Sequence, residues 1–185
     1  MGMSGCVTPG PDTQFYTLNE PNELDLAAPL ASTPAVVVGP VQLPEVLDRP
    51  QIVTRADQHR LNVHEFHRWG GSFSDEIARA VQADLLRLLG SDRVALYGTS
   101  EFSADYRVGL DIGRFDGGLG SDVVLELRWS IFEGTTGRLA AVYRSRIIDT
   151  ADGAGIGPLV AAQSRALAAV SRLIAEEIAR LRTLK

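Results

Sequence analysis

The sequence is short of cysteine, with Cys6 the only one in 185 residues. One cysteine cannot close an internal disulfide, so packing of apolar side chains must hold the fold together. A chain of this length fits one domain and buries roughly 70% of the surface that its unfolded state exposes. No apolar run approaches the ~18 residues of a membrane-spanning helix. The sequence therefore predicts a soluble domain whose core is large enough without covalent crosslinks.

Lysine is almost absent, since Lys185 is the only one, and the formal net charge is -5. Binding to phosphate backbones needs a surplus of basic side chains, so general nucleic-acid binding is not expected. The abundant arginines accompany abundant alanines, which favours genomic base composition over selection for phosphate binding.

Motifs of catalysis are missing as well. No G-x-S-x-G element precedes a helix, and the glycine-rich stretch 113–120 lacks the GK[ST] ending of a phosphate-binding loop. His59, His64 and His67 cluster around Glu65, but the flanking pattern is extended or irregular and no further ligand completes a metal site. We therefore expect solvated histidines, no metal, no cofactor and no enzymatic activity.

Cys6 follows the small residues Ser4-Gly5, as at the end of a bacterial lipoprotein signal, where the cysteine becomes the lipidated first residue. Met1-Gly2 resembles an added start that replaces the charged and apolar parts of such a signal. Residues 7–11 form a short tether rich in Gly, Pro and Thr. We expect a lipid anchor at Cys6, a lipobox remnant and tether over residues 1–12, and one folded domain over residues 13–185.

Apolar periodicity predicts several strands in that domain. Residues 14–18 and 35–38 are β-prone, residues 20–33 resemble a loop, and residues 51–55 and 60–65 suggest a hairpin. Three long runs, 106–112, 123–131 and 139–147, alternate apolar and polar side chains, and their short glycine-rich connections make neighbouring strands antiparallel.

Two helices complete the pattern. One begins near Ser72 or Ser74, either of which can cap it, and stops at Gly90. The other begins near Pro158 and carries apolar residues at spacings of three and four. The sequence thus predicts an α+β fold in which two amphipathic helices pack on one face of an antiparallel sheet.

The segment LPEVLDRPQIVTR, residues 43–55, combines rigid and interactive residues. Its prolines stiffen the backbone, and arginine and tryptophan are enriched where interfaces are energetically important. We interpret it, with the nearby "RW" pair, as a surface for a partner or for self-association. The alternative is internal salt bridges for the arginines and a core position for the tryptophan. The candidate residues are Leu43, Pro44, Leu47, Arg49, Pro50, Arg55, Arg68 and Trp69.

Three blocks, FYTL (residues 15–18), VVVGPVQLPEVLDRPQIVTR (36–55) and EFHRW (65–69), resemble the PqiC family of ABC-type transport auxiliary lipoproteins. The P-x-x-L-D-R-P-Q-I-V-x-R block is the most specific of them. Gly70-Gly71 stands where the family usually has a more polar or helix-friendly pair.

The resemblance implies a non-enzymatic lipoprotein on the periplasmic face of the outer membrane. Its partner would be an MCE-domain membrane protein of the PqiB type, in an intermembrane lipid transport system that supports envelope integrity. A homo-oligomeric ring around that partner is a further implication. On this interpretation, replacing Arg49 and Arg55 by Ala abolishes association while sparing the fold.

Two other functions remain open at this stage. An adaptor lipoprotein for another envelope machine, such as a cell-wall synthase or a secretion pore, would use a similar small domain. A lipid carrier would need a cavity between the sheet and the helices.

Overall fold

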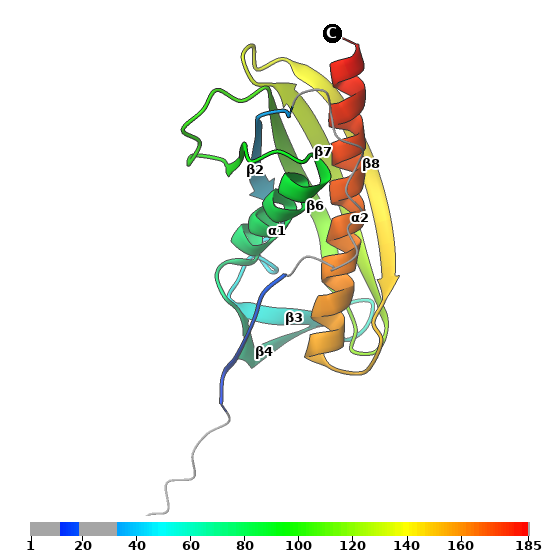
Figure 1. Cartoon of the computed structure of the whole chain (residues 1–185). Coiled ribbons are helices and arrows are strands. Elements are labelled where there is room, and N and C mark those ends of the chain that lie inside the picture. The colour runs from blue at the N-terminus through cyan, green and yellow to red at the C-terminus, as the bar shows by residue number, and fades with distance from the viewer. Residues whose placement is uncertain (1–11, 19–32, 185) are drawn as a thin grey trace, which may run out of the picture.

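The computed structural model describes residues 12–18 and 33–184 of the chain (Figure 1). Its strands are β1 (Gln14–Tyr16), β2 (Val36–Gln42), β3 (Gln51–Arg55), β4 (Leu61–Trp69), β5 (Val94–Leu96), β6 (Tyr106–Gly117), β7 (Asp122–Glu133) and β8 (Leu139–Thr150). Its helices are α1 (Phe73–Leu88) and α2 (Ile156–Thr183). The predicted α+β class is confirmed. The loop expected over residues 20–33 and the anchor at Cys6 lie almost wholly outside the described residues.

The larger sheet has five strands in the order β5-β2-β6-β7-β8. Strands β6, β7 and β8 are antiparallel neighbours of twelve residues each, as the alternating runs predicted. Along β6 the inward side chains of Val108, Leu110 and Ile112 are buried, while Asp111 between them is exposed. The strict alternation therefore produces one dry face and one wet face.

The expectation of a purely antiparallel sheet is corrected at β2, which runs parallel to both of its neighbours, β5 and β6. Between β2 and β5 the chain forms β3, β4 and α1, and such a long crossover allows a strand to return in the same direction. At Gly39 the backbone adopts φ +116°, and an added Cβ would lie 3.0 Å from the Cβ of Tyr97. The first four residues of β2, Val36 to Gly39, are all buried, so their pattern does not alternate and gives no sign of direction.

A smaller sheet has the order β1-β4-β3. The predicted hairpin of β3 and β4 is confirmed, and β1 pairs in parallel with the end of β4. Gln51 of β3 faces Arg68, whereas the next residue, Ile52, faces His64. Residues 65–67 therefore bulge out of the ladder, which ends the regular hairpin before β4 reaches β1.

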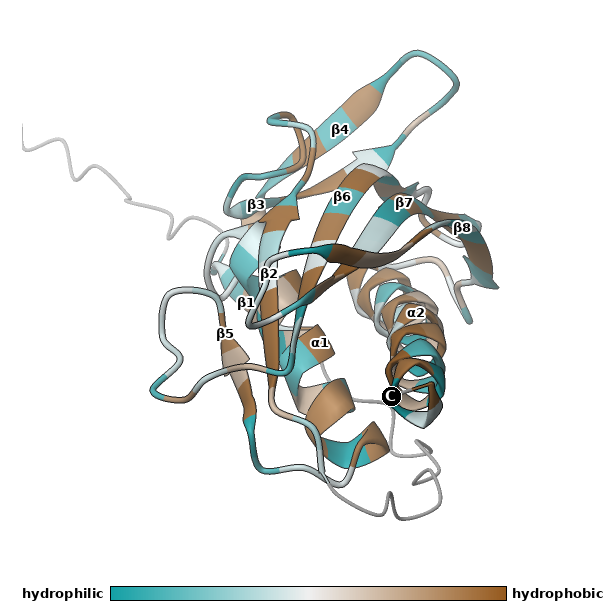
Figure 2. Ribbon diagram, turned by 90° about the horizontal axis from the view of Figure 1, so that it is seen from above, coloured by the Kyte–Doolittle hydropathy of each residue, from teal (hydrophilic) through white to brown (hydrophobic). Residues whose placement is uncertain are grey.

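Both predicted helices are confirmed, and Figure 2 shows them on the same face of the larger sheet. Ser72 caps α1 by accepting a hydrogen bond from the backbone N–H of Asp75 at 3.2 Å. Gly90 leaves that helix with φ +56°, the left-handed geometry that glycine adopts without strain. The long α2 begins at Ile156, so Pro158 lies in its first turn.

An aromatic stack connects the two sheets. Trp69 of β4 lies parallel to Phe73 of α1 with ring centroids 4.5 Å apart, and Phe73 stacks on Phe115 of β6 at 5.4 Å. All three rings are buried. The small sheet is therefore part of the main core and not an appended unit, because burial of each large ring stabilises the fold by a few kcal/mol.

Neither described helix has the combination of length and hydropathy that crossing a membrane requires.

Candidate docking surface

The segment that follows β2 is a tight turn. The backbone N–H groups of Leu47 and Asp48 donate to the carbonyl of Pro44 at 2.8 and 3.1 Å. Leu47 is buried in the core and Leu43 packs against it. Since Pro44 also fixes its own backbone angle, the turn has little freedom left to lose when something binds to it.

Two further contacts tie this turn to its surroundings. The Asp48 carboxylate accepts hydrogen bonds from the backbone N–H and the hydroxyl of Ser74, at 3.1 and 2.9 Å, at the start of α1. A carboxylate is favoured there because unpaired N–H groups give a helix a positive end. On the other side, the N–H of Trp69 donates to the carbonyl of Pro50 at 2.7 Å. The turn is thus pinned to α1 and to β4.

Arg49 stands out in this fixed turn. Its Nε atom is buried, and it has no hydrogen-bond partner among the described residues. The side chain is half-buried overall, and the residues that the structure describes offer it no ion pair. A buried donor without an acceptor costs roughly 1–3 kcal/mol, so Arg49 gains from any acceptor brought to it.

Arg55 has a different role. Its guanidinium donates to both oxygens of the Asp116 carboxylate, Nε to Oδ1 at 2.8 Å and the terminal nitrogen to Oδ2 at 2.6 Å. Arg114 adds a third hydrogen bond to Oδ1 at 2.9 Å. Burial opposes the charge on Asp116, but these hydrogen bonds outweigh it and hold the pKa of Asp116 below its ordinary value. The same bidentate pair raises the pKa of Arg55.

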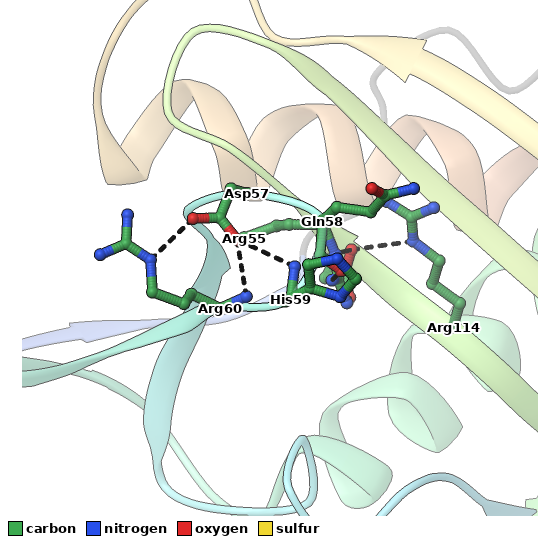
Figure 3. Close-up of polar contacts among 7 residues, drawn as sticks. Arg55, Asp57, Gln58, His59, Arg60 and Arg114 are labelled. Carbon is green, nitrogen blue, oxygen red and sulfur yellow. Dashed lines mark hydrogen bonds and ion pairs between the residues drawn. The ribbon is translucent and has the colours of Figure 1, made fainter.

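The turn after Arg55 is organised by Asp57 (Figure 3). Its Oδ1 accepts from the backbone N–H groups of His59 and Arg60, both at 2.9 Å, and its Oδ2 accepts from Arg60 Nε at 2.7 Å. These contacts, led by the bond from His59, lower the pKa of Asp57. An aspartate that binds the following backbone amides is a common way to close a short turn.

Trp69 and Arg68 are neighbours in the chain with opposite surroundings. Trp69 is only 3% exposed and belongs to the aromatic stack, so its ring does not offer an outer face. Arg68 is half-buried, donates to the carbonyl of Glu65 at 3.1 Å, and lies opposite Gln51 in the ladder. Gln51 follows Arg49 by two residues, so Arg68 and Arg49 belong to neighbouring segments of the chain.

The structure thus separates the eight candidate residues into two groups. Leu43, Leu47 and Trp69 pack in or against the core, and Arg55 joins the two sheets. The others reach solvent, together with Val46, whose side chain is 46% exposed. We call the accessible group the Arg49 surface; it consists of Pro44, Val46, Arg49, Pro50 and Arg68.

The histidines are placed individually. His59 is exposed, whereas His64 and His67 are half-buried and not simply solvated. Nε2 of His64 lies 2.9 Å from the Thr54 hydroxyl, and Nδ1 of His67 lies 2.9 Å from the Tyr16 hydroxyl. Burial, and then the nearby His67, lower the pKa of His64. Within residues 12–18 and 33–184, no three His, Cys, Asp or Glu side chains converge as metal ligands would.

Sequence reasoning missed the two acidic partners in this region. Asp48 lies 26 residues before Ser74, and Asp116 lies 61 residues after Arg55. The sequence around Asp116 does indicate a special role, because an aspartate near the end of an apolar strand is either a turn residue or the partner of a buried cation. Only the fold decides between those two roles.

Comparisons with known proteins agree with the fold. Residues 16–175 match the model of a family described as an ABC-type transport auxiliary lipoprotein component. No curated protein sequence matches the chain.

Two solved structures share the architecture over most of their length. A protein from Xanthomonas campestris is 17% identical with a TM-score of 0.72, over 93% of this chain and 98% of that one. A second, described only as an uncharacterized protein, is 16% identical with a TM-score of 0.72, over 91% and 99% of the two chains. At such identities the likeness concerns the fold alone.

Proposed function

The chain belongs to the family of ABC-type transport auxiliary lipoproteins, and from this premise we propose that it is a non-enzymatic docking component of an intermembrane lipid transport system. The family implies a membrane-anchored protein of the cell envelope that assists an ABC transport system. More specifically, we propose that the partner is an MCE-domain membrane protein of the PqiB type, and that the complex supports envelope integrity.

Anchoring in this proposal depends on Cys6. Acyl chains on that residue would hold the domain at the outer membrane, facing the periplasm, and more than one chain is needed for durable attachment. The first described residue, Asp12, is the sixth after Cys6, and a chain spans at most about 3.5 Å per residue. The tether therefore keeps the domain within roughly 20 Å of the bilayer.

The observation that carries the docking proposal is the unmatched Nε of Arg49 in a turn that is already rigid. Binding to a rigid surface loses little conformational entropy, and an acceptor from the partner would relieve the buried donor. Val46 of the same turn and Arg68 of β4, which pairs with the residue after Pro50, also reach solvent. Arginine is one of the residue types enriched at the energetically important centres of protein interfaces.

A ring of identical subunits around a tubular partner remains part of the proposal. In a closed ring each subunit uses two different patches, one for each neighbour. The Arg49 surface is then available for the central partner or for one neighbour, but not for both.

Crosslinking in the native envelope tests the proposal directly. We expect wild-type protein to be recovered with an MCE-domain protein, and Arg49→Ala to reduce that recovery severalfold while the purified domain keeps its melting temperature. Arg60→Ala is the matched control, because Arg60 is 77% exposed and its neighbour Asp57 sits in a solvent-exposed turn. Recovery of a cell-wall synthase or a secretion pore instead would favour the adaptor function and overturn the proposal.

A further inference from the structure

The last strand of the larger sheet has a free edge. Among the described residues only β7 is hydrogen-bonded to β8, which is twelve residues long. Figure 1 shows β8 at the margin of the fold, running beside α2. Alternate backbone N–H and C=O groups of an edge strand point outward without a partner strand, so such an edge is a template for another strand.

The face of β8 that points away from the helices carries an unbalanced charge. Arg144 lies directly opposite Arg128 in the ladder. Arg128 donates to Asp111 at 2.9 Å, but Arg144 has no acidic partner among the residues that the structure describes. Like charges opposite each other in adjacent strands destabilise a sheet, and an acidic side chain on the free side of Arg144 would offset this.

The other face of β8 borders an open hollow of about 340 Å³, formed between the strand and the C-terminal half of α2. Trp129 and Tyr143 line it, with ring centroids 4.6 Å apart, and Trp129 is held by a 3.0 Å hydrogen bond from its Nε1 to the Ser145 hydroxyl. Leu173 of α2, 38% exposed, lines it from the helix side. Charged residues of the helix, Glu176, Glu177 and Arg180, complete the lining, so an apolar side chain fits against the part formed by Trp129, Tyr143 and Leu173.

We propose that β8 is a docking strand for an extended segment of a partner protein, which pairs with its free edge, places an acidic side chain opposite Arg144 and inserts an apolar side chain beside Tyr143. In strand addition, backbone hydrogen bonds give affinity and side-chain contacts on alternate positions give specificity. The partner segment therefore alternates acidic and apolar residues. This surface is separate from the Arg49 surface and does not depend on the proposed transport role.

A second copy of β8 does not satisfy this requirement. Directly opposed residues in paired strands point to the same side of a sheet, so Arg144 would face a residue from its own side of β8. That side carries Val142, Arg144, Arg146, Ile148 and Thr150, none of which is acidic. The strand that pairs with the free edge is therefore not β8 of a second copy.

The test uses the whole domain and two short labelled peptides, one alternating valine with glutamate and the other valine with lysine. We expect the glutamate peptide to bind, with fluorescence anisotropy rising on addition of protein and Trp129 emission changing, while the lysine peptide does not. Arg144→Glu should lower the affinity for the glutamate peptide roughly tenfold, because it turns a cross-strand attraction into a repulsion. The same variant should bind the lysine peptide. Arg60→Glu makes the same charge change on the small sheet and should leave both affinities unchanged.

Two further variants separate strand addition from simple charge attraction. Methylating the backbone nitrogens of the glutamate peptide removes its ladder donors and should abolish binding. Leu173→Gln, an uncharged change at an exposed helix position, removes the apolar contact and should weaken binding without unfolding the domain. Equal binding of the two peptides, retention of the methylated one, or self-association through β8 without peptide binding would each overturn the proposal.

Discussion

Arg55 of β3 and Asp116 of β6 form a bidentate ion pair that fastens the small sheet to the large one, with nitrogen–oxygen distances of 2.8 and 2.6 Å. Asp116 is 2% exposed and Arg55 28% at the side chain. Removing one partner of such a pair leaves a buried charge, which is the expensive outcome, whereas the intact pair itself contributes little net stability. Arg55 is therefore an internal residue, in contrast to Arg49.

Arg55→Ala should destabilise the fold by roughly 2–3 kcal/mol, less than for an isolated buried charge because Arg114 still reaches Asp116. Urea denaturation measures the change. The double variant that adds Asp116→Asn should recover part of the loss, since the amide carries no charge to desolvate. An Arg55→Ala domain as stable as wild type would show that the pair is solvated. Because Arg55→Ala disturbs the fold, association tests of the Arg49 surface should replace Arg49 alone.

Acid should weaken the same junction. The folded-state pKa of Asp116 is below its ordinary value of 3.8, so the folded state binds fewer protons than the unfolded state near that pH. Its stabilisation is present above pH 4 and is lost as the pH falls toward the folded-state pKa. Free energies of unfolding across that window should fall less steeply for Asp116→Asn than for wild type. Parallel curves for the two proteins would contradict the assignment.

His64 is a base and not an acid, but a fall in pH should reduce the stability of the fold through it as well. Burial lowers its pKa in the folded state below the ordinary 6.5, so protonation favours unfolding. Its contribution is complete above pH 6.5 and decreases as the pH falls through that value. NMR titration of the ring protons should give a midpoint below 6.5. A midpoint at or above that value would mean that the His64 ring is not buried in solution as the structure describes.

Helix α1 offers a test of local structure. Ser72→Ala removes the oxygen that accepts the N–H of Asp75, and should cost about 1 kcal/mol. Ser103→Ala, at an exposed position, is the matched control. Thermal denaturation should separate the two variants. Equal melting temperatures would place the start of the helix elsewhere.

Two glycines should respond to alanine in opposite directions. At Gly134 an added Cβ would overlap the carbonyl oxygen of Ala104, so Gly134→Ala should be clearly destabilising. At Gly157, in the first turn of α2, an added Cβ meets nothing within 4 Å. Gly157→Ala should therefore stabilise by up to about 1 kcal/mol, chiefly by restricting the unfolded chain. Denaturation midpoints check both signs.

Much of the fold could be predicted because its signals are local. The alternation of Val108, Leu110 and Ile112 and the apolar stripe of α2 each show which face is buried, independent of the rest of the chain. The parallel pairing of β2 could not be predicted, because its buried first half does not alternate and its direction depends on a crossover of some fifty residues. The three-residue β5 is too short to give a pattern.

The sequence allowed us to predict which segment forms the candidate surface, but not which of its residues face solvent and which are internal. Composition places Arg49 and Arg55 in one block, and residue type alone treats them alike. What distinguishes them is Asp116, which lies on β6 in the other sheet and meets Arg55 only in the folded chain. Burial of Trp69 likewise depends on Phe73 and Phe115, which come from two later elements.

The placement of β1 has a mechanical consequence. Any pull on the N-terminal end of the chain enters the domain through a strand of three residues, which is held by its ladder to the last residues of β4. From there the load crosses to the body through the stacked rings and the Arg55–Asp116 link. In the proposed complex, movement of the membrane relative to the partner would thus load the junction of the two sheets first, before the long hairpins of the main sheet.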